Sequence, residues 1–475
     1  MTDAANLPLD CTTLQSAYRR GALSPLTVAD EVLRRIEARD DDHVWVSRAD
    51  PEAVRAQARR LAERRGEMAR LPLYGLPFGV KDNVDVEGLP TTCGCEGYGR
   101  LPQHSAAAVQ RAIDAGALFI GKQTLDQFAT GLNGTRTTGG HCLNVFDPAV
   151  IPGGSSSGSG VAVAAGLVSF SLGSDTGGSG RVPAAMNNIV GVRPTIGLVS
   201  SRGMVYNNRL FDCMPVFAHT VDDAFMVLEA IAGFDAHDPL SRADADGIAL
   251  DAPEPARFRF AVPRRLEFFG DMQSPACFEA ALLRLERIGG ERCEIDFSLF
   301  HEAGALVFES ALVAERSASY GEVLERLPHA LVPAVESILR RARGYSAVDA
   351  FQAQYRLQAL RQQAKRLLTG IDVVVTPTVA RPFRVDEMLA EPIVRNAEVG
   401  HYTYGVGPLD LCALALPAAM RPDGLPFGIS LVGRAGHDGA LRALGRRFEA
   451  ATGLVPGVGA SAAHLRRQEA HHLRE

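Results

Sequence analysis

A glycine- and serine-rich stretch, residues 153–194, carries the side chains of this sequence best suited to covalent chemistry. It contains two loops, 153–160 and 173–181, in which small residues replace those that could bury apolar area. A chain accepts the entropic cost of glycine where its backbone must approach a ligand closely. The second loop contains Thr176, Gly177, Gly178 and Ser179, whose consecutive backbone N–H groups can form an anion cradle. Beside a nucleophile such a cradle is an oxyanion hole, so we interpret Ser179 as a nucleophile among its own oxyanion donors.

A serine hydroxyl is a weak nucleophile and needs a base that takes its proton. The stretch 153–194 contains neither histidine nor lysine, so the base must come from another part of the chain. Our candidate is Lys81, which ends the apolar, strand-like run 76–80. Burial lowers the pKa of a lysine, and a neutral amine can accept a proton.

Together these segments resemble the amidase signature family, whose catalytic set is a lysine, a serine that follows a cis peptide bond, and a nucleophilic serine. Lys81 matches the lysine of the family's KD segment, Ser155 the first serine of its GGSS run, and Ser179 the serine of GxDxxGS. The two serines are 24 positions apart, which is the family's spacing. The resemblance extends from about residue 12 to about residue 455. It implies a proton relay from Ser179 through Ser155 to Lys81, an acyl-enzyme, and no metal or organic cofactor.

Residues 154–158 also match G-x-S-x-G, the nucleophile elbow of α/β-hydrolases, with Ser156 as the nucleophile. An elbow requires a downstream acid and a histidine. Three histidines could serve, although none has a distinctive context: His219, His301 and His401. We therefore prefer Ser179 as the nucleophile and Ser155 over its neighbour Ser156 as the middle residue. Close to the nucleophile, we expect Arg181 to have a structural role in an ion pair with Asp175.

The elements expected around these residues alternate between helices and strands. Helices are expected over 12–40, 52–69, 106–115, 221–232 and 438–452. Strands are expected over 76–81, 118–122, 258–262, 371–375 and within 409–432. This alternation predicts an α/β fold, and with the family resemblance an amidase signature fold. Its central sheet should be mixed and largely parallel, covered by helices on both faces.

We expect three regions along the chain: an N-terminal helical region, 1–70, a catalytic domain, 71–455, and a flexible tail, 456–475. Within the catalytic domain, residues 234–256 are rich in Asp, Ala and Pro and predict a surface linker. Further helices near 275–288, 301–320, 329–343 and 347–369 predict a helical layer over the site, covering 275–369.

Composition excludes several classes of function. The 475 residues are 46% hydrophobic and 22% charged, as in an ordinary globular protein. A net charge of −6 gives no reason to expect nucleic acid or an anionic membrane as a partner. We expect a cytoplasmic protein, because no signal peptide or membrane-spanning run is evident and the eight cysteines are scattered. The one close pair, Cys93 and Cys95, lacks a second pair at ligand spacing, so no metal site is expected.

Further segments resemble the allophanate hydrolase branch of the family, which hydrolyses urea-1-carboxylate and releases ammonia. They are 125–131, 157–159, 180–184, 187–191, 201–203, 211–213, 410–415 and 423–428. That branch recognises the substrate carboxylate partly with the arginine of a VAER segment, which residues 313–316 match. Arg316 is thus the candidate carboxylate clamp, since a guanidinium can form two parallel hydrogen bonds to a carboxylate. The alternative is a helix-surface arginine paired with a nearby acid.

Three departures from that branch predict a shifted substrate. Phe308 replaces a substrate-facing tyrosine, and the segments 137–140 and 401–408 differ from the branch's versions. Because an unpaired polar group in a pocket is costly, several altered contacts would change selectivity. The substrate could be allophanate, another small carboxylate-bearing amide or urea, or a different small or apolar amide. A further alternative is the glutaminase subunit of an amidotransferase. The motifs that resemble the allophanate hydrolase branch argue against it.

The resemblance also bears on partners. Allophanate hydrolases often continue into a second domain that handles the carboxylated product, so we expect this chain to be an amidase domain alone. Whether a separate protein supplies that second activity stays open. Homodimers are common in the family, which makes a second copy of the chain a candidate partner beside the small-molecule substrate.

Overall fold

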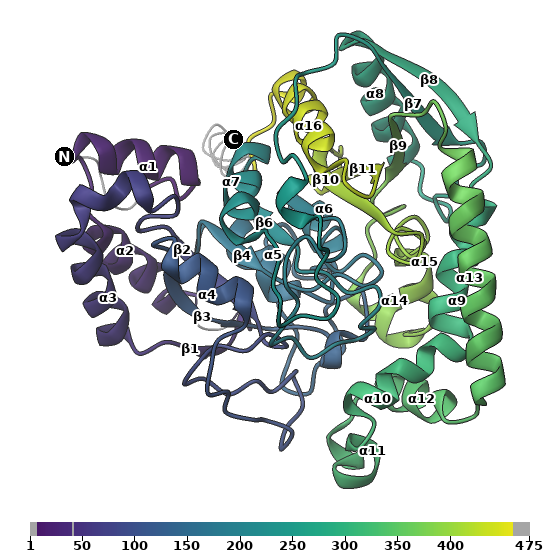
Figure 1. Ribbon diagram of the computed structural model, residues 1–475, viewed down its shortest axis with the longest axis horizontal. Helices are drawn as coiled ribbons and strands as arrows, with labels where there is room; N and C mark the ends of the chain where they lie inside the picture. The colour runs from purple at the N-terminus through teal and green to yellow at the C-terminus, as the bar shows by residue number, and fades with distance from the viewer. Residues whose placement is uncertain (1–6, 40–41, 459–475) are drawn as a thin grey trace, which may run out of the picture.

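The computed structural model describes residues 7–39 and 42–458, and the expected tail from residue 459 onward lies outside the described residues. One eleven-stranded sheet runs through the molecule, in the order β1-β3-β2-β4-β6-β5-β10-β11-β9-β7-β8 (Figure 1). The strands are β1 (Trp45–Arg48), β2 (Pro77–Lys81), β3 (Leu118–Gln123), β4 (Phe170–Leu172), β5 (Val190–Arg193), β6 (Val216–Ala218), β7 (Phe258–Pro263), β8 (Gly290–Ile295), β9 (Val373–Pro377), β10 (Leu411–Met420) and β11 (Pro426–Arg434).

The sheet is mixed, as expected, but the expectation that it is largely parallel is wrong. Four of the ladders among the described strands are parallel and six are antiparallel. The hairpin of β10 and β11 explains much of this, because a short connection can join only antiparallel strands. This hairpin lies in the middle of the sheet and pairs antiparallel with β5 on one side and β9 on the other.

Helices cover both faces of the sheet. Residues of opposite parity on a strand point to opposite faces, and β11 shows this at two glycines. Gly428 faces Ala185 of α6 (Val182–Met186), whereas Gly433 faces Leu441 of α16 (Asp438–Thr452). On the α6 side α5 (Ser157–Ala164) packs against α6, and on the α16 side α7 (Val221–Ile231) packs against α16. The α/β architecture expected from the sequence is therefore confirmed.

The N-terminal part is less purely helical than expected. The helix expected over 12–40 is two helices, α1 (Cys11–Arg20) and α2 (Pro25–Glu37). Gly21 ends α1 in the left-handed region, at φ 71°, and Ser24 caps α2, so the chain turns between them. After α2, β1 joins the catalytic sheet by pairing with β3, and α3 (Pro51–Glu63) follows.

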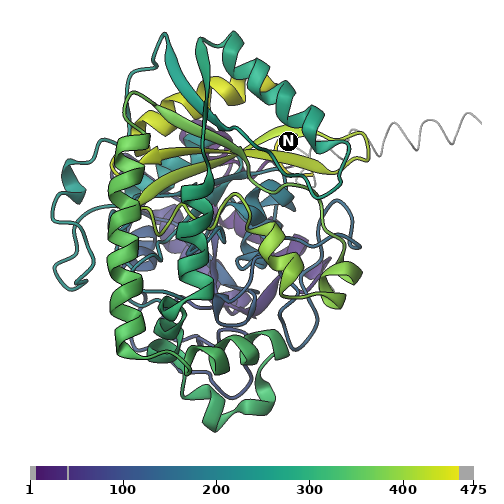
Figure 2. The same ribbon diagram turned by 90° about the vertical axis from the view of Figure 1, so that its right-hand side faces the viewer.

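A layer of helices lies beside the sheet, but it is narrower than the expected range 275–369. Residues 274–295 instead form α8 (Ser274–Arg287) and β8, which packs in parallel on β7. The layer consists of α9 (Ser298–Glu309), α10 (Glu315–Tyr320), α11 (Val323–Arg326), α12 (Pro333–Ala342) and α13 (Ala347–Leu367). Helices α9 and α13 run side by side (Figures 1 and 2). Two short helices, α14 (Val385–Ala390) and α15 (Val394–Val399), precede β10, and α4 (Ala107–Asp114) precedes β3.

The expected linker, 234–256, has little regular structure beyond one 3-10 turn, Ala245–Gly247. It is held in place by buried carboxylates, since Asp235 and Asp238 accept hydrogen bonds from Ser200 and Ser201. Across 7–39 and 42–458, none of the helices combines the length and the apolar character required to cross a membrane.

Candidate active site

The structure brings Lys81, Ser155 and Ser179 together in a buried chain of hydrogen bonds. The Lys81 amine lies 2.7 Å from Ser155 Oγ, and Ser155 Oγ lies 2.8 Å from Ser179 Oγ. Lys81 ends β2, and Ser179 precedes α6. The peptide bond between Gly154 and Ser155 is cis, as the family resemblance implies. A Cβ at position 154 would lie 2.2 Å from the Asp126 carboxylate, so only glycine fits before Ser155.

The surroundings of Lys81 suit a base. Burial lowers the pKa of the Lys81 amine to about 7, against the opposing charges of Asp126, Asp212 and Asp175. A substantial fraction is therefore neutral near pH 7 and can accept a proton. A second hydroxyl, that of Ser174, lies 2.8 Å from the amine. Sequence reasoning missed Ser174, although its place in the loop that carries Ser179 could have drawn attention to it.

Three backbone N–H groups beside Ser179 are free to bind an oxyanion. Those of Thr176, Gly177 and Ser179 form no hydrogen bond with any described residue. The expectation that Gly178 is a fourth oxyanion donor is wrong, because its N–H donates to the Asp175 carboxylate at 2.9 Å. Gly178 has φ 142°, and a Cβ there would lie 2.4 Å from the Thr403 hydroxyl, so its role is to let the loop turn.

Asp175 holds this loop in shape. Its carboxylate lies 3.0 Å from Arg181 Nε and 2.9 Å from Arg193 Nη1, and all three side chains are fully buried. Although burial favours the neutral acid, the charges of Arg181 and Arg193 outweigh it and hold the pKa of Asp175 well below its ordinary value. The structural role expected for Arg181 is confirmed.

Replacement of Asp175 by Asn should therefore destabilise the protein. Removing one partner of a buried ion pair commonly costs about 3–5 kcal/mol. Because the pKa of Asp175 is lowered on folding, its stabilisation is complete above the ordinary pKa and is lost as the pH falls below it. Urea unfolding at neutral pH measures the effect, and Asp244→Asn, at an exposed pair with Arg242, is the matched control, expected to change stability by less than about 1 kcal/mol. Equal midpoints for the two variants would contradict the role given to Asp175.

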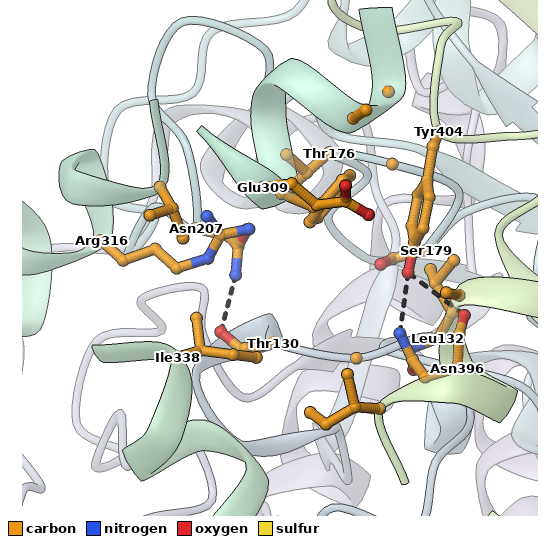
Figure 3. Close-up of a pocket in the computed structure, with 18 of the residues that line it drawn as sticks. Thr130, Leu132, Thr176, Ser179, Asn207, Glu309, Arg316, Ile338, Asn396 and Tyr404 are labelled. Atoms are coloured by element: carbon orange, nitrogen blue, oxygen red, sulfur yellow. Dashed lines mark hydrogen bonds between the residues drawn. The ribbon is translucent and has the colours of Figure 1, made fainter. Parts of the chain in front are cut away.

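Ser179 opens onto a cavity of about 600 Å³ that also contains Arg316 (Figure 3). Arg316 is 1% exposed, and neither its Nε nor its Nη1 has a hydrogen-bond partner. Among the described residues it forms no ion pair with a carboxylate, and its guanidinium carbon lies 5.2 Å from the centre of the Phe308 ring. Burial lowers the pKa of Arg316. The alternative of a surface arginine paired with an acid is therefore wrong.

Two of the three departures from the allophanate hydrolase branch line this cavity. They are Phe308 and, from 401–408, His401 and Tyr404. The third, 137–140, lines a separate surface groove beside Trp45, so the expectation that it changes pocket contacts is wrong. Arg136, which precedes this segment, does line the cavity, and its guanidinium donates to the carbonyls of Thr130 and Pro392.

The histidine that a nucleophile elbow requires is not found next to Ser156 among the described residues. Ser156 donates a hydrogen bond to the Ser174 carbonyl at 3.2 Å, and no histidine of the described residues bonds to Ser156 or Ser179. His301 and His401 contact each other in a tilted arrangement, with ring centroids 4.4 Å apart. The buried chain that ends at Lys81 is thus the arrangement able to activate a serine here.

Comparison with known proteins agrees with this geometry. The model of the Amidase family matches residues 27–441. A urea amidolyase of Saccharomyces cerevisiae is 38% identical over 86% of this chain and 22% of that protein. A glutamyl-tRNA(Gln) amidotransferase protein of Acidobacterium capsulatum is 33% identical over 92% of this chain and 98% of that protein. The solved structure of Kluyveromyces lactis allophanate hydrolase is 34% identical, with a TM-score of 0.88 over 95% of this chain and 73% of that one.

The chain spans about a quarter of the length of the urea amidolyases it matches. The family match, by contrast, covers most of the chain and includes all three residues of the buried hydrogen-bonded chain. The chain therefore belongs to the amidase signature family of hydrolases that act on carbon–nitrogen bonds, and its relatives include allophanate hydrolase.

Proposed function

We propose that this protein hydrolyses an amide or urea-type bond of a small substrate that carries a carboxylate, and that it releases ammonia. The observation that carries the proposal is Arg316, a buried guanidinium without an acidic partner in the cavity that contains Ser179. A buried, uncompensated charge is costly, so a site of this kind favours an anionic ligand. The relationship to urea amidolyase and allophanate hydrolase supports the same class of substrate.

The proposed reaction begins as Ser179 Oγ attacks the substrate carbonyl carbon. Its proton passes to Ser155, whose own proton passes to neutral Lys81. The free N–H groups of Thr176, Gly177 and Ser179 bind the oxygen that becomes negative, and one such donor is commonly worth about 2.7–4 kcal/mol of barrier. The proton then returns along the same path to the leaving nitrogen, and ammonia departs. Water attacks the acyl-enzyme by the same route and restores Ser179.

Phe308 bears on which carboxylate substrate is preferred. The allophanate hydrolase branch has a tyrosine at this position, and Phe308 lacks its hydroxyl. The substrate therefore loses one hydrogen-bond donor, and Arg316 must bind the carboxylate without it. A guanidinium can still bind a carboxylate with two parallel hydrogen bonds. The substrate is therefore allophanate or a related carboxylate-bearing amide whose geometry needs no donor at Phe308.

Ammonia release from a panel of substrates tests this function. The panel contains allophanate, biuret, malonamate, malonamide, glutamine and a neutral aliphatic amide. Turnover of allophanate or malonamate well above that of malonamide would support the proposal. Preference for the neutral amides would favour the alternative of a different small or apolar amide, and exclusive turnover of glutamine would favour the glutaminase component of an amidotransferase.

Arg316→Ala should lower kcat/KM for malonamate about 10- to 100-fold, the value of a charge-assisted hydrogen bond. Its effect on malonamide, which has no carboxylate, should be less than about threefold. Arg316→Lys should recover only part of the loss, because a lysine amine cannot bind both carboxylate oxygens as a guanidinium does. Arg341→Ala, at an exposed arginine that also lines the cavity, is the control for a general loss of positive charge. Equal losses on malonamate and malonamide would remove Arg316 as the clamp.

A further inference from the structure

The cavity at Ser179 is larger than a small carboxylate-bearing amide needs. Its volume of about 600 Å³ equals the share of roughly 20 water molecules in the liquid. Malonamate has as many non-hydrogen atoms as about seven waters, so it would fill roughly a third of this space. Cavities of this volume ordinarily enclose ligands much larger than malonamate.

The two ends of the cavity differ in polarity and burial. The inner end is polar and buried, with Ser179 3%, Thr176 4% and Arg316 1% exposed. We call the aliphatic, partly exposed part of the lining the outer end; it consists of Ala305, Ile338, Ile393 and Ala397, which come from α9, α12 and the region of α15. Ile393 is 46% exposed, so its side chain is accessible to a ligand that enters the cavity from outside.

Two aromatic rings of the lining lie next to each other and beside the Gly177 backbone. Phe308 and Tyr404 both line the cavity, and their ring centroids are 4.1 Å apart. The Tyr404 hydroxyl is engaged by Asn396, which donates to it at 2.7 Å, so the ring is fixed (Figure 3). These are also positions at which the sequence departs from the allophanate hydrolase branch. The departures therefore fall in the lining of the cavity, where they change the surface that a substrate contacts.

The outer end presents little charge. Burial, with a contribution from His301, lowers the pKa of His401 to about 4, and burial also lowers the pKa of His301. Burial thus favours the neutral form of both imidazoles. The charged groups of this end, Glu309 and Arg341, are exposed and so lie at its rim. An apolar group entering the outer end would displace water without leaving a buried charge unpaired.

We propose that the outer end is a subsite for an apolar substituent of the substrate, one the size of a phenyl ring. The substrate class is then a carboxylate-bearing amide with a bulky apolar group, its carboxylate at Arg316, its carbonyl at Ser179 and its substituent against Ile338 and Ile393. This inference rests on the proposed function for the carboxylate and adds a third point of recognition. Burial of one methylene is worth about a fourfold change in an equilibrium constant, so a benzyl group should raise kcat/KM at least about tenfold.

The test compares matched substrate pairs. Ammonia release is measured with malonamate and 2-benzylmalonamate, and with acetamide and 3-phenylpropanamide, which differ by the same benzyl group. The expected result is a kcat/KM for 2-benzylmalonamate at least about tenfold above that for malonamate. A ratio of one or less would overturn the subsite. If neither malonamate nor allophanate is hydrolysed, the proposed function fails, and the neutral pair decides the subsite by the same ratio.

Two cavity variants and one surface control test whether the benzyl group binds at the outer end. Ile338→Ala should reduce the benzyl-to-unsubstituted ratio of kcat/KM at least about threefold, because it removes aliphatic contact from the outer end. Ala397→Trp should reduce the ratio further by filling the space. Leu389→Ala, at an aliphatic side chain that is 58% exposed and does not line the cavity, should leave the ratio unchanged. A benzyl preference that persists in both cavity variants would place the apolar group elsewhere and overturn the assignment.

Discussion

Ser179→Ala is expected to lower kcat about 10⁴-fold or more while leaving the protein folded, because it removes the attacking oxygen. The change deletes one buried hydroxyl whose side-chain hydrogen bond is to Ser155. The loop itself is held by Asp175 and the two arginines around it, so its shape does not depend on the Ser179 hydroxyl. Ammonia release measures the loss, and circular dichroism with urea unfolding verifies the fold.

Ser156→Ala is the matched control. Ser156 is equally buried, but its hydroxyl donates to the Ser174 carbonyl and lies outside the chain that ends at Lys81. We expect Ser156→Ala to keep kcat within about tenfold of the wild type, the cost of one neutral hydrogen bond. If Ser179→Ala kept near-normal activity and Ser156→Ala were inactive, Ser156 would be the nucleophile, as the nucleophile elbow requires.

Lys81→Ala should lower kcat/KM about 10³-fold, within the range of a general base. Lys81→Arg should not restore activity, since a guanidinium stays charged and cannot accept the proton. The wild type should show a kcat/KM that rises with pH through about 7 and levels off above it. The sign follows from burial, which lowers the pKa of Lys81 to about 7, so the neutral base exists above that pH.

Another buried group titrates nearby and provides a control for the pH profile. Burial raises the pKa of Asp212 to about 6, against a hydrogen bond from the Thr176 hydroxyl. If Lys81 is the base, Asp212→Asn should keep the rise but move it to lower pH, because the charge of Asp212 opposes the lowering of the Lys81 pKa. A flat profile between pH 5 and pH 9 in the wild type, or loss of the rise in Asp212→Asn, would contradict the assignment of Lys81.

The placement of Lys81, Ser155 and Ser179 could be predicted from sequence because each lies in a short motif with few alternatives. The small residues beside Ser155 and Ser179 are required by close contacts of the backbone, such as that between Gly154 and Asp126, and they stand out in the sequence. The structural pairing of Arg181 with Asp175 was predictable for the same reason, since six residues separate them.

Other features depend on contacts between distant segments and could not be predicted. Whether the Gly178 N–H is free is decided by which way the Asp175 side chain turns, which no motif specifies. The antiparallel majority in the sheet follows from where the β10–β11 hairpin inserts, between β5 and β9. The segment 137–140 lines the groove beside Trp45, and this neighbourhood of distant segments is not specified by any local motif.

The most direct test of the account is to find which serine becomes acylated. A fluorophosphonate, which reacts with activated serine hydroxyls, is added to the protein at pH 8, and the modified residue is located by mass spectrometry of peptides. The account predicts one adduct, on Ser179, that is lost in Ser179→Ala and forms much more slowly in Lys81→Ala. An adduct on Ser156, or labelling of Ser179 that is unchanged in Lys81→Ala, would contradict the relay through Ser155 to Lys81.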